Sequence, residues 1–120
     1  MKKFLSVAAV LSTSLFASQA SAASMECYVD TQAYDQYTSG HCFALVYGAR
    51  SATAVFRIAG ANKPISSVIW GDKAASCGTS GTSCSFTIRP FVSNKASATI
   101  LYQDGTWATA SATASFEDGR

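Results

Sequence analysis

Strict alternation of small apolar and hydroxyl side chains near the end of the chain constrains the fold most. From residue 107 to residue 116 every even-numbered position is Ala or Phe, and every odd-numbered position is Trp, Thr or Ser. A β-strand places successive side chains on opposite faces, whereas a helix would scatter both sets around its circumference. The segment is therefore predicted to be a strand whose alanine-lined face points inward.

Weaker alternation along the rest of the chain predicts further short strands between turn signals. Asp104-Gly105 lies between two alternating runs and is typical of a hairpin with a type I′ turn, which needs positive φ at both central residues. No amphipathic helix is evident, so we expect an all-β, antiparallel β-sandwich of about seven strands; a small all-β barrel is the alternative. The predicted strands are residues 25–29, 42–47, 52–58, 65–70, 84–88, 96–102 and 107–116.

The first 22 residues have the composition of a secretory leader. A positive start, Met1-Lys2-Lys3, precedes an apolar stretch over residues 4–17, and Ala20-Ser21-Ala22 supplies the small residues of a cleavage site. The apolar stretch is too short, and too rich in Ser and Thr, for a stable membrane span. We therefore expect residues 1–22 to be a signal peptide and residues 23–120 to be one domain that is secreted or periplasmic, with no membrane span.

The expected mature segment is close to electrically neutral. The chain has nine Lys and Arg and seven Asp and Glu, but Lys2 and Lys3 lie in the leader, so seven basic residues remain against seven acidic ones. Nucleic-acid binding depends on neutralising phosphates with basic side chains. A nucleic-acid partner is therefore not expected.

All four cysteines follow the predicted cleavage point, in a compartment where disulfides persist. Four cysteines allow three pairings, and spacing alone does not decide among them. We favour Cys77–Cys84, whose spacer of Gly, Ser and Thr closes easily, and Cys27–Cys42, which encloses fourteen residues. Because no C-x-x-C motif is present, we predict structural disulfides and no metal site.

Three features of the sequence belong together: Val68-x-Trp70 on a middle strand, the alternating pair of terminal strands, and Tyr102-x-Asp104-Gly105-Thr106 at their hairpin. In these features the chain resembles bacterial secreted immunoglobulin-like β-sandwich domains. The resemblance covers residues 42–116, and it implies a fold and not an activity. The predicted strand 96–102 contains no Cys, so the disulfide that crosses between the sheets of antibody domains is not expected.

No catalytic constellation stands out in the sequence. His41 is the single histidine, so a Ser-His-acid triad would have to use it with Asp30 or Asp35, and no G-x-S-x-G motif is present. The two aspartates are also the candidates for calcium, but the D-x-D-x-D-G loop is missing. We therefore expect no enzyme, no metal and no cofactor.

Aromatic side chains are better candidates for function. Tyr34 and Tyr37 lie in a Tyr-rich segment and offer the contact area that binding loops use; alternatively, they cover one end of the core. Trp107 lies on the hydroxyl side of the last strand, where it would stack on a sugar or a protein, unless it contacts Leu101 or Tyr102 across the hairpin.

These observations lead to one principal hypothesis and three alternatives. The principal hypothesis is a non-enzymatic, exported binding or adhesion module with a protein or glycan ligand. The second is an inhibitor of a secreted hydrolase, a protease or a lysozyme, that binds through the Tyr-rich segment. The others are a small hydrolase centred on His41 and a pilin-like subunit; a pilin would need a donated strand, whereas this chain has its own last strand. The sequence leaves the ligand and the oligomeric state open.

Overall fold

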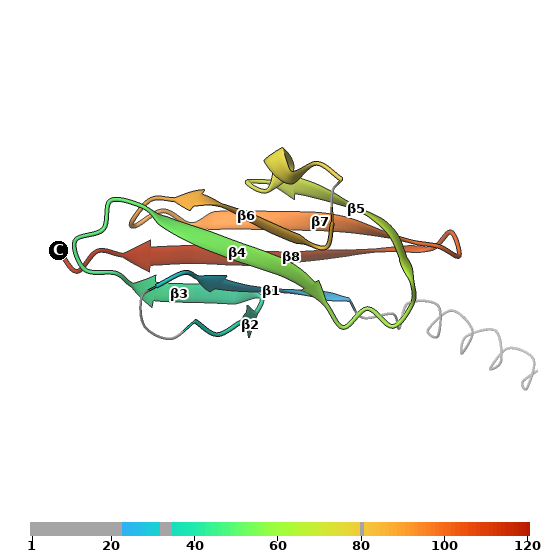
Figure 1. Ribbon diagram of the computed structural model, residues 1–120, viewed down its shortest axis with the longest axis horizontal. Helices are drawn as coiled ribbons and strands as arrows, with labels where there is room; N and C mark the ends of the chain where they lie inside the picture. The colour runs from blue at the N-terminus through green and yellow to red at the C-terminus, as the bar shows by residue number, and fades with distance from the viewer. Residues whose placement is uncertain (1–22, 32–34, 80) are drawn as a thin grey trace, which may run out of the picture.

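The computed structural model describes residues 23–31, 35–79 and 81–120, and these form two stacked four-stranded sheets (Figure 1). The predicted leader, residues 1–22, lies outside the described residues. Sheet 1 has the order β2-β1-β4-β6, with β1 at Ser24–Val29, β2 at Thr38–Ser39, β4 at Ala52–Ala59 and β6 at Ser83–Ile88. Sheet 2 has the order β3-β8-β7-β5, with β3 at His41–Leu45, β5 at Ile65–Asp72, β7 at Asn94–Tyr102 and β8 at Trp107–Glu117.

Helical structure is minimal in the described part of the chain. The 3-10 helix η1, Ala75–Cys77, follows β5 and is the only helical element there. Within the described ranges no helix has the length and apolar character needed to cross a membrane. The described part of the chain is therefore all-β, as the alternation predicts.

The alternation along β8 determines which face of sheet 2 is buried. Ala112, Ala114 and Phe116 are at most 2% exposed, whereas the Thr and Ser side chains between them are partly exposed. The predicted inward alanine face is therefore confirmed. Alanine lets the two sheets approach closely, and larger side chains fill the remaining space between them. The largest fully buried side chains are Phe56, Phe116, Met25, Ile88, Ile100 and Val68.

The chain turns from sheet 1 into sheet 2 at Gly40, where the backbone has a φ of +78°. β2 pairs with β1 before this residue, and β3 pairs with β8 after it. Glycine adopts the left-handed conformation at little cost, so it permits the sharp change of sheet. The new strand runs parallel to β8.

This turn corrects two expectations from the sequence. The described residues form eight strands and not about seven, because the two-residue β2 is too short to show any alternation. The sandwich is also not wholly antiparallel: five strand pairings are antiparallel, and the β3–β8 pairing is parallel.

Two disulfides tie sheet 2 to sheet 1, one near each edge of sheet 2. Cys27 on β1 is bonded to Cys42 on the edge strand β3, and Cys77 in η1, beside the edge strand β5, is bonded to Cys84 on β6. These are the two pairs that the loop lengths favour. Neither bridge is the antibody-type one, since β7 contains no Cys. The turn at Gly40 carries Cys42 into sheet 2, so the Cys27–Cys42 bridge crosses between the sheets at a different place.

Phe56 lies between the two disulfides in the middle of sheet 1. Its Cα partners are Cys27 on β1 and Cys84 on β6, and directly paired residues face the same side of a sheet. All three side chains are buried in the core, and the Phe56 ring stacks on Phe86 with 5.2 Å between ring centroids. The Phe56 side chain is therefore the direct neighbour of one cysteine from each disulfide.

β7 and β8 form the hairpin predicted at Asp104-Gly105, but the turn is not type I′. Leu101 pairs with Trp107, the Tyr102 N–H donates to the Thr106 carbonyl at 2.9 Å, and within the turn only Gly105 has a positive φ, at +88°. The type I′ expectation is therefore wrong. The hairpin extends past the strand ends of sheet 1, at the right of Figure 1.

Candidate binding surface

Trp107 begins β8 on the outer face of sheet 2, where 65% of the residue is exposed. It also pairs with Leu101 of β7. The sequence offered exposure of the indole and a contact with Leu101 as alternatives, and the structure has both. Further along the same two strands, Thr99 pairs with Thr109 and Ser97 with Ser111. The outer face next to the indole is therefore lined by neutral hydroxyl groups.

Three exposed apolar side chains meet near the opposite end of β8. Phe43 on β3 is 54% exposed, and Phe91 and Val92 in the β6–β7 connection are 59% and 41% exposed. They line an open hollow of about 290 Å³ together with Ser115 and Glu117 of β8. We name Phe43, Phe91 and Val92 the apolar patch. A contiguous apolar surface with a polar border is typical of an interaction site.

The backbone holds Phe91 in a strained conformation. Its φ is +63°, a left-handed value that is sterically unfavourable for a bulky side chain, at a cost on the order of 1–3 kcal/mol. The Phe91 N–H donates to the Phe116 carbonyl at 2.8 Å. Buried Asn94 donates through Nδ2 to the carbonyls of Val92, at 2.9 Å, and Ala114, at 3.2 Å. These bonds fasten the connection to β8, so that the Phe91 ring projects into solvent.

Tyr37 lies against sheet 1, not beside Trp107. The Arg57 guanidinium is 3.6 Å from the Tyr37 ring centroid and pairs with Glu26 at 2.7 Å. The Tyr28 ring meets Tyr37 edge-on at 4.8 Å. Burial in this cluster raises the pKa of Tyr28, and Tyr37 raises it further. Tyr37 is therefore half-buried in a structural contact, while Tyr34 lies outside the described residues.

The remaining chemical candidates do not assemble in the described part of the chain. His41 is exposed at the start of β3, and no carboxylate contact of its imidazole is found among the described residues. Asp35 accepts bonds from the Thr31 N–H at 2.9 Å and from its hydroxyl at 3.0 Å, and its hydrogen bond with Asp30 raises the pKa of Asp30. No group of three or more His, Cys, Asp or Glu suited to a metal ion occurs among the described residues.

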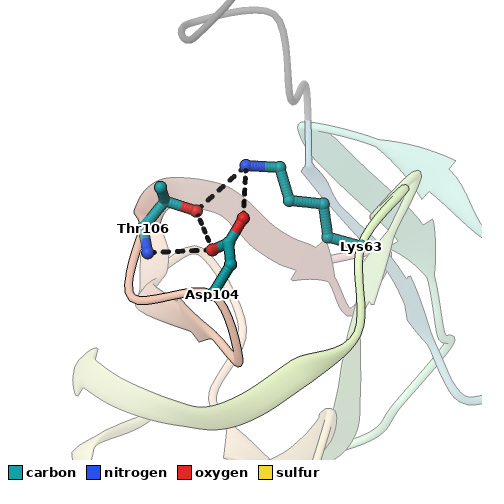
Figure 2. Close-up of polar contacts among 3 residues, drawn as sticks. All are labelled: Lys63, Asp104 and Thr106. Atoms are coloured by element: carbon teal, nitrogen blue, oxygen red, sulfur yellow. Dashed lines mark hydrogen bonds and ion pairs between the residues drawn. The ribbon is translucent and has the colours of Figure 1, made fainter.

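A polar cluster fastens the hairpin just before Trp107 (Figure 2). The Thr106 N–H and hydroxyl both donate to Asp104 Oδ1, and Lys63 Nζ lies 3.0 Å from Thr106 Oγ1 and 3.3 Å from Asp104 Oδ2. The hydrogen bonds from Thr106, and to a smaller extent Lys63, lower the pKa of Asp104 from its ordinary 3.8 to about 2. The cluster joins the β4–β5 connection to the turn that precedes Trp107.

We expect the Asp104 carboxyl to titrate near pH 2 in an NMR pH series on the folded protein. Because the folded-state pKa lies below the ordinary value, the stabilisation from this cluster is present above about pH 4 and is lost as the pH falls toward 2. Thr106→Val should raise the midpoint more than Lys63→Met, since the threonine hydroxyl is the larger cause. A midpoint of about 3.8 in the unaltered protein, or the reverse order of the variants, would contradict this prediction.

Sequence reasoning did not find the apolar patch. Phe91 and Val92 follow Pro90 as two consecutive apolar residues outside any alternating run, which is a signal for exposed apolar side chains. Phe43 follows buried Cys42 in the strand, so alternation indicates that its side chain points outward. Phe43 lies near Phe91 and Val92 only because β3 pairs with β8, and no local sequence pattern predicts that pairing.

The structure thus separates the residues proposed from the sequence, Trp107 and Tyr37, onto different sheets, and it brings together three others in the apolar patch. Comparison of the chain with protein-family models, with curated proteins and with solved structures gives no match.

Proposed function

We propose that the mature chain is an exported, non-enzymatic binding module with an immunoglobulin-like fold, and that it recognises another protein through the apolar patch. The observation that carries this proposal is Phe91, a bulky residue kept exposed on a left-handed backbone. Neither the strained φ nor the exposed ring stabilises the isolated fold. Contact with a partner gives both features a physical reason, because exposed aromatic residues next to a hollow are typical of protein interfaces.

The order of the strands supports the immunoglobulin-like part of the proposal. Immunoglobulin domains place strands A, B and E side by side in one sheet and C, F and G in the other. In chain order β1, β4 and β6 take the places of A, B and E, and β5, β7 and β8 take those of C, F and G. Trp70 is buried on β5, as the family's tryptophan is on strand C.

Export is supported by the composition of residues 1–22 and by the two disulfides, which persist in oxidising compartments. The hydrolase-inhibitor alternative depended on the Tyr-rich segment as a binding loop. Tyr37 is half-buried against Arg57, which leaves that alternative with less support.

A glycan ligand is the second candidate, and Trp107 is the observation that favours it. Its exposed indole borders the paired hydroxyl groups of β7 and β8, which would accept and donate hydrogen bonds to sugar hydroxyls. This surface is more polar than the apolar patch and lies toward the other end of β8. The two candidates are therefore separable by mutation.

Capture experiments with the processed protein test the proposal. We expect Phe43→Ser and Phe91→Ser each to weaken binding of a secreted-protein partner by roughly 30-fold or more, as for an aromatic hot spot. Ile69→Ser is the matched control, because Ile69 is 46% exposed on β5, away from the patch. Glycan-array binding that is lost in Trp107→Ala and kept in Phe91→Ser would favour the second candidate instead.

Phe91→Gly separates binding from folding. Glycine accepts a φ of +63° without strain, so this variant should unfold at a temperature no lower than the unaltered protein while losing the partner. A partner that binds the glycine variant with undiminished affinity would show that the exposed ring has another role.

A further inference from the structure

The first half of β8 has a free edge. β3 pairs with β8 only from Thr113 to Glu117, whereas β7 pairs with β8 from Trp107 to Ala114 on the other side. Among the described residues, no strand pairs with the β3 side of residues 107–112. At about 3.3 Å per residue this edge is roughly 20 Å long, the length of an ordinary strand.

The hydrogen-bonding direction of the free edge follows from its neighbour. The Thr113 N–H donates toward β3, to the Gly40 carbonyl at 3.1 Å. In an antiparallel pair, the N–H and C=O of one residue point to the same side, and those of the next residue point to the other side. Thr109 and Ser111 therefore present both backbone groups to the free edge, and Ala108 and Ala110 present theirs to β7.

A hollow borders the empty strand position. It measures about 550 Å³, and its lining includes Thr109, Ala110 and Ser111 together with Ser24 at the start of β1 and Gly40 before β3. It also extends over β8 to Lys95, Ser97 and Thr99 on the outer face of β7. The inner face of β8 is also less covered beside the free edge: Ala110 is only half-buried, whereas Ala112 and Ala114 are at most 2% exposed. The gap thus has the position and the small-residue inner surface that suit one added strand.

Three of the four edge strands have features that natural proteins use to protect a sheet edge. β2 has only two residues, β6 is followed by Arg89-Pro90, and β5 ends at Gly71-Asp72 with η1 beside it. The free edge has no such protection, because residues 107–116 contain no charge and no proline. A sheet edge that lacks these features and has a hollow beside it indicates a binding site for an added strand.

We propose that the occupant is a second copy of this chain, whose own free edge pairs antiparallel with the first around a twofold axis beside Thr109. Pairing of Thr109 and Ser111 with the odd-numbered edge residues of the other copy keeps the alanines of both copies on one face and the hydroxyl groups on the other. The edge is neutral, so two copies do not repel each other. The dimer would join both copies of sheet 2 into one continuous sheet. This inference does not depend on the apolar patch, which lies beside the other half of β8.

Analytical ultracentrifugation of the processed protein tests the proposal. We expect a monomer–dimer equilibrium with a Kd on the order of 100 μM, because a single strand pairing buries less than a standard interface. The equilibrium should change little with salt, since no ion pair forms it. Protein that stays monomeric up to about 1 mM would overturn the proposal.

Ser111→Pro assigns the dimer to this edge. Proline removes an N–H that faces the gap and leaves the β7 pairing intact, so the dimer should weaken at least tenfold. Ser85→Pro on β6 is the matched control: the Ile58 N–H donates to the Thr82 carbonyl, so alternation places the Ser85 N–H on the outer side of that edge strand. A dimer that survives Ser111→Pro, or that is lost equally in Ser85→Pro, would contradict the assignment.

Hydrogen exchange on the unaltered protein gives a readout that needs no variant. The amides of Thr109 and Ser111 should become protected as the protein concentration rises through the Kd, whereas the Ser85 amide should not. Equal exchange of Thr109 and Ser111 at low and high concentration would place any dimer on another surface.

Discussion

Replacement of both Cys27 and Cys42 by alanine is expected to lower the free energy of unfolding by about 3 kcal/mol. The bridge closes a loop with a sequence separation of 15 residues, and without it the unfolded chain regains the entropy of that loop. It also fastens the edge strand β3 to sheet 1. For a small domain with a total stability of about 5–15 kcal/mol this loss is large. Urea unfolding followed by circular dichroism measures it.

Alanine replacement of Cys77 and Cys84 provides the comparison. This bridge has a sequence separation of only 7 residues, so its removal should cost about 2 kcal/mol, less than removal of the first bridge. The order of the two urea midpoints is the test. Equal stability with and without Cys27–Cys42, or a larger loss from Cys77–Cys84, would show that loop entropy is not the main contribution.

Phe56→Ala is expected to cost about 3–5 kcal/mol, which would leave little of the folded state. Phe56 has no exposed surface, its ring stacks on Phe86, and its Cα neighbours Cys27 and Cys84 belong to the two disulfides. The disulfides restrict how far the core can collapse around the missing ring, so a cavity should remain.

Phe56→Leu is the graded control, since it retains most of the side-chain volume and should cost less than half as much. Phe43→Ala removes the same ring from an exposed position and should change stability by no more than about 0.5 kcal/mol. Thermal unfolding of the three variants gives the ranking. A loss in Phe43→Ala similar to that in Phe56→Ala would mean that the outer face of sheet 2 is packed against something in the folded protein.

Local pattern predicted those parts of the fold in which each strand carries its own signal. The alternation of Ala112, Ala114 and Phe116 with hydroxyl residues gave both the strand and its buried face. Val68 and Trp70, two positions apart in the predicted strand 65–70, lie on the same face of β5, and both are buried. These predictions succeed because burial of one face of a strand imposes a period of two on the sequence itself.

The functional candidates were predicted less well, because exposure does not say which exposed residues are neighbours. Trp107 is exposed, as the alternation along β8 predicts. Tyr37, by contrast, packs on Arg57, which lies 20 positions later in the chain and on the far side of β1. Phe43 and Phe91 become neighbours only because each is fastened to β8, one by strand pairing and the other by the hydrogen bond to Phe116. Contacts between residues so far apart leave no periodic trace in the sequence.

By itself the sequence determined that the chain forms short strands, which side of the last strand is buried, and that β7 and β8 form a hairpin. Only the tertiary structure decided that β3 crosses to sheet 2 and pairs in parallel with the second half of β8, leaving the first half without a neighbour. The physical reason is that burial of one face produces a period of two within each strand's own sequence. Strand order depends instead on the direction of the chain at turns such as Gly40 and on backbone hydrogen bonds. Any residue except proline can make those bonds, so they leave no pattern in the sequence.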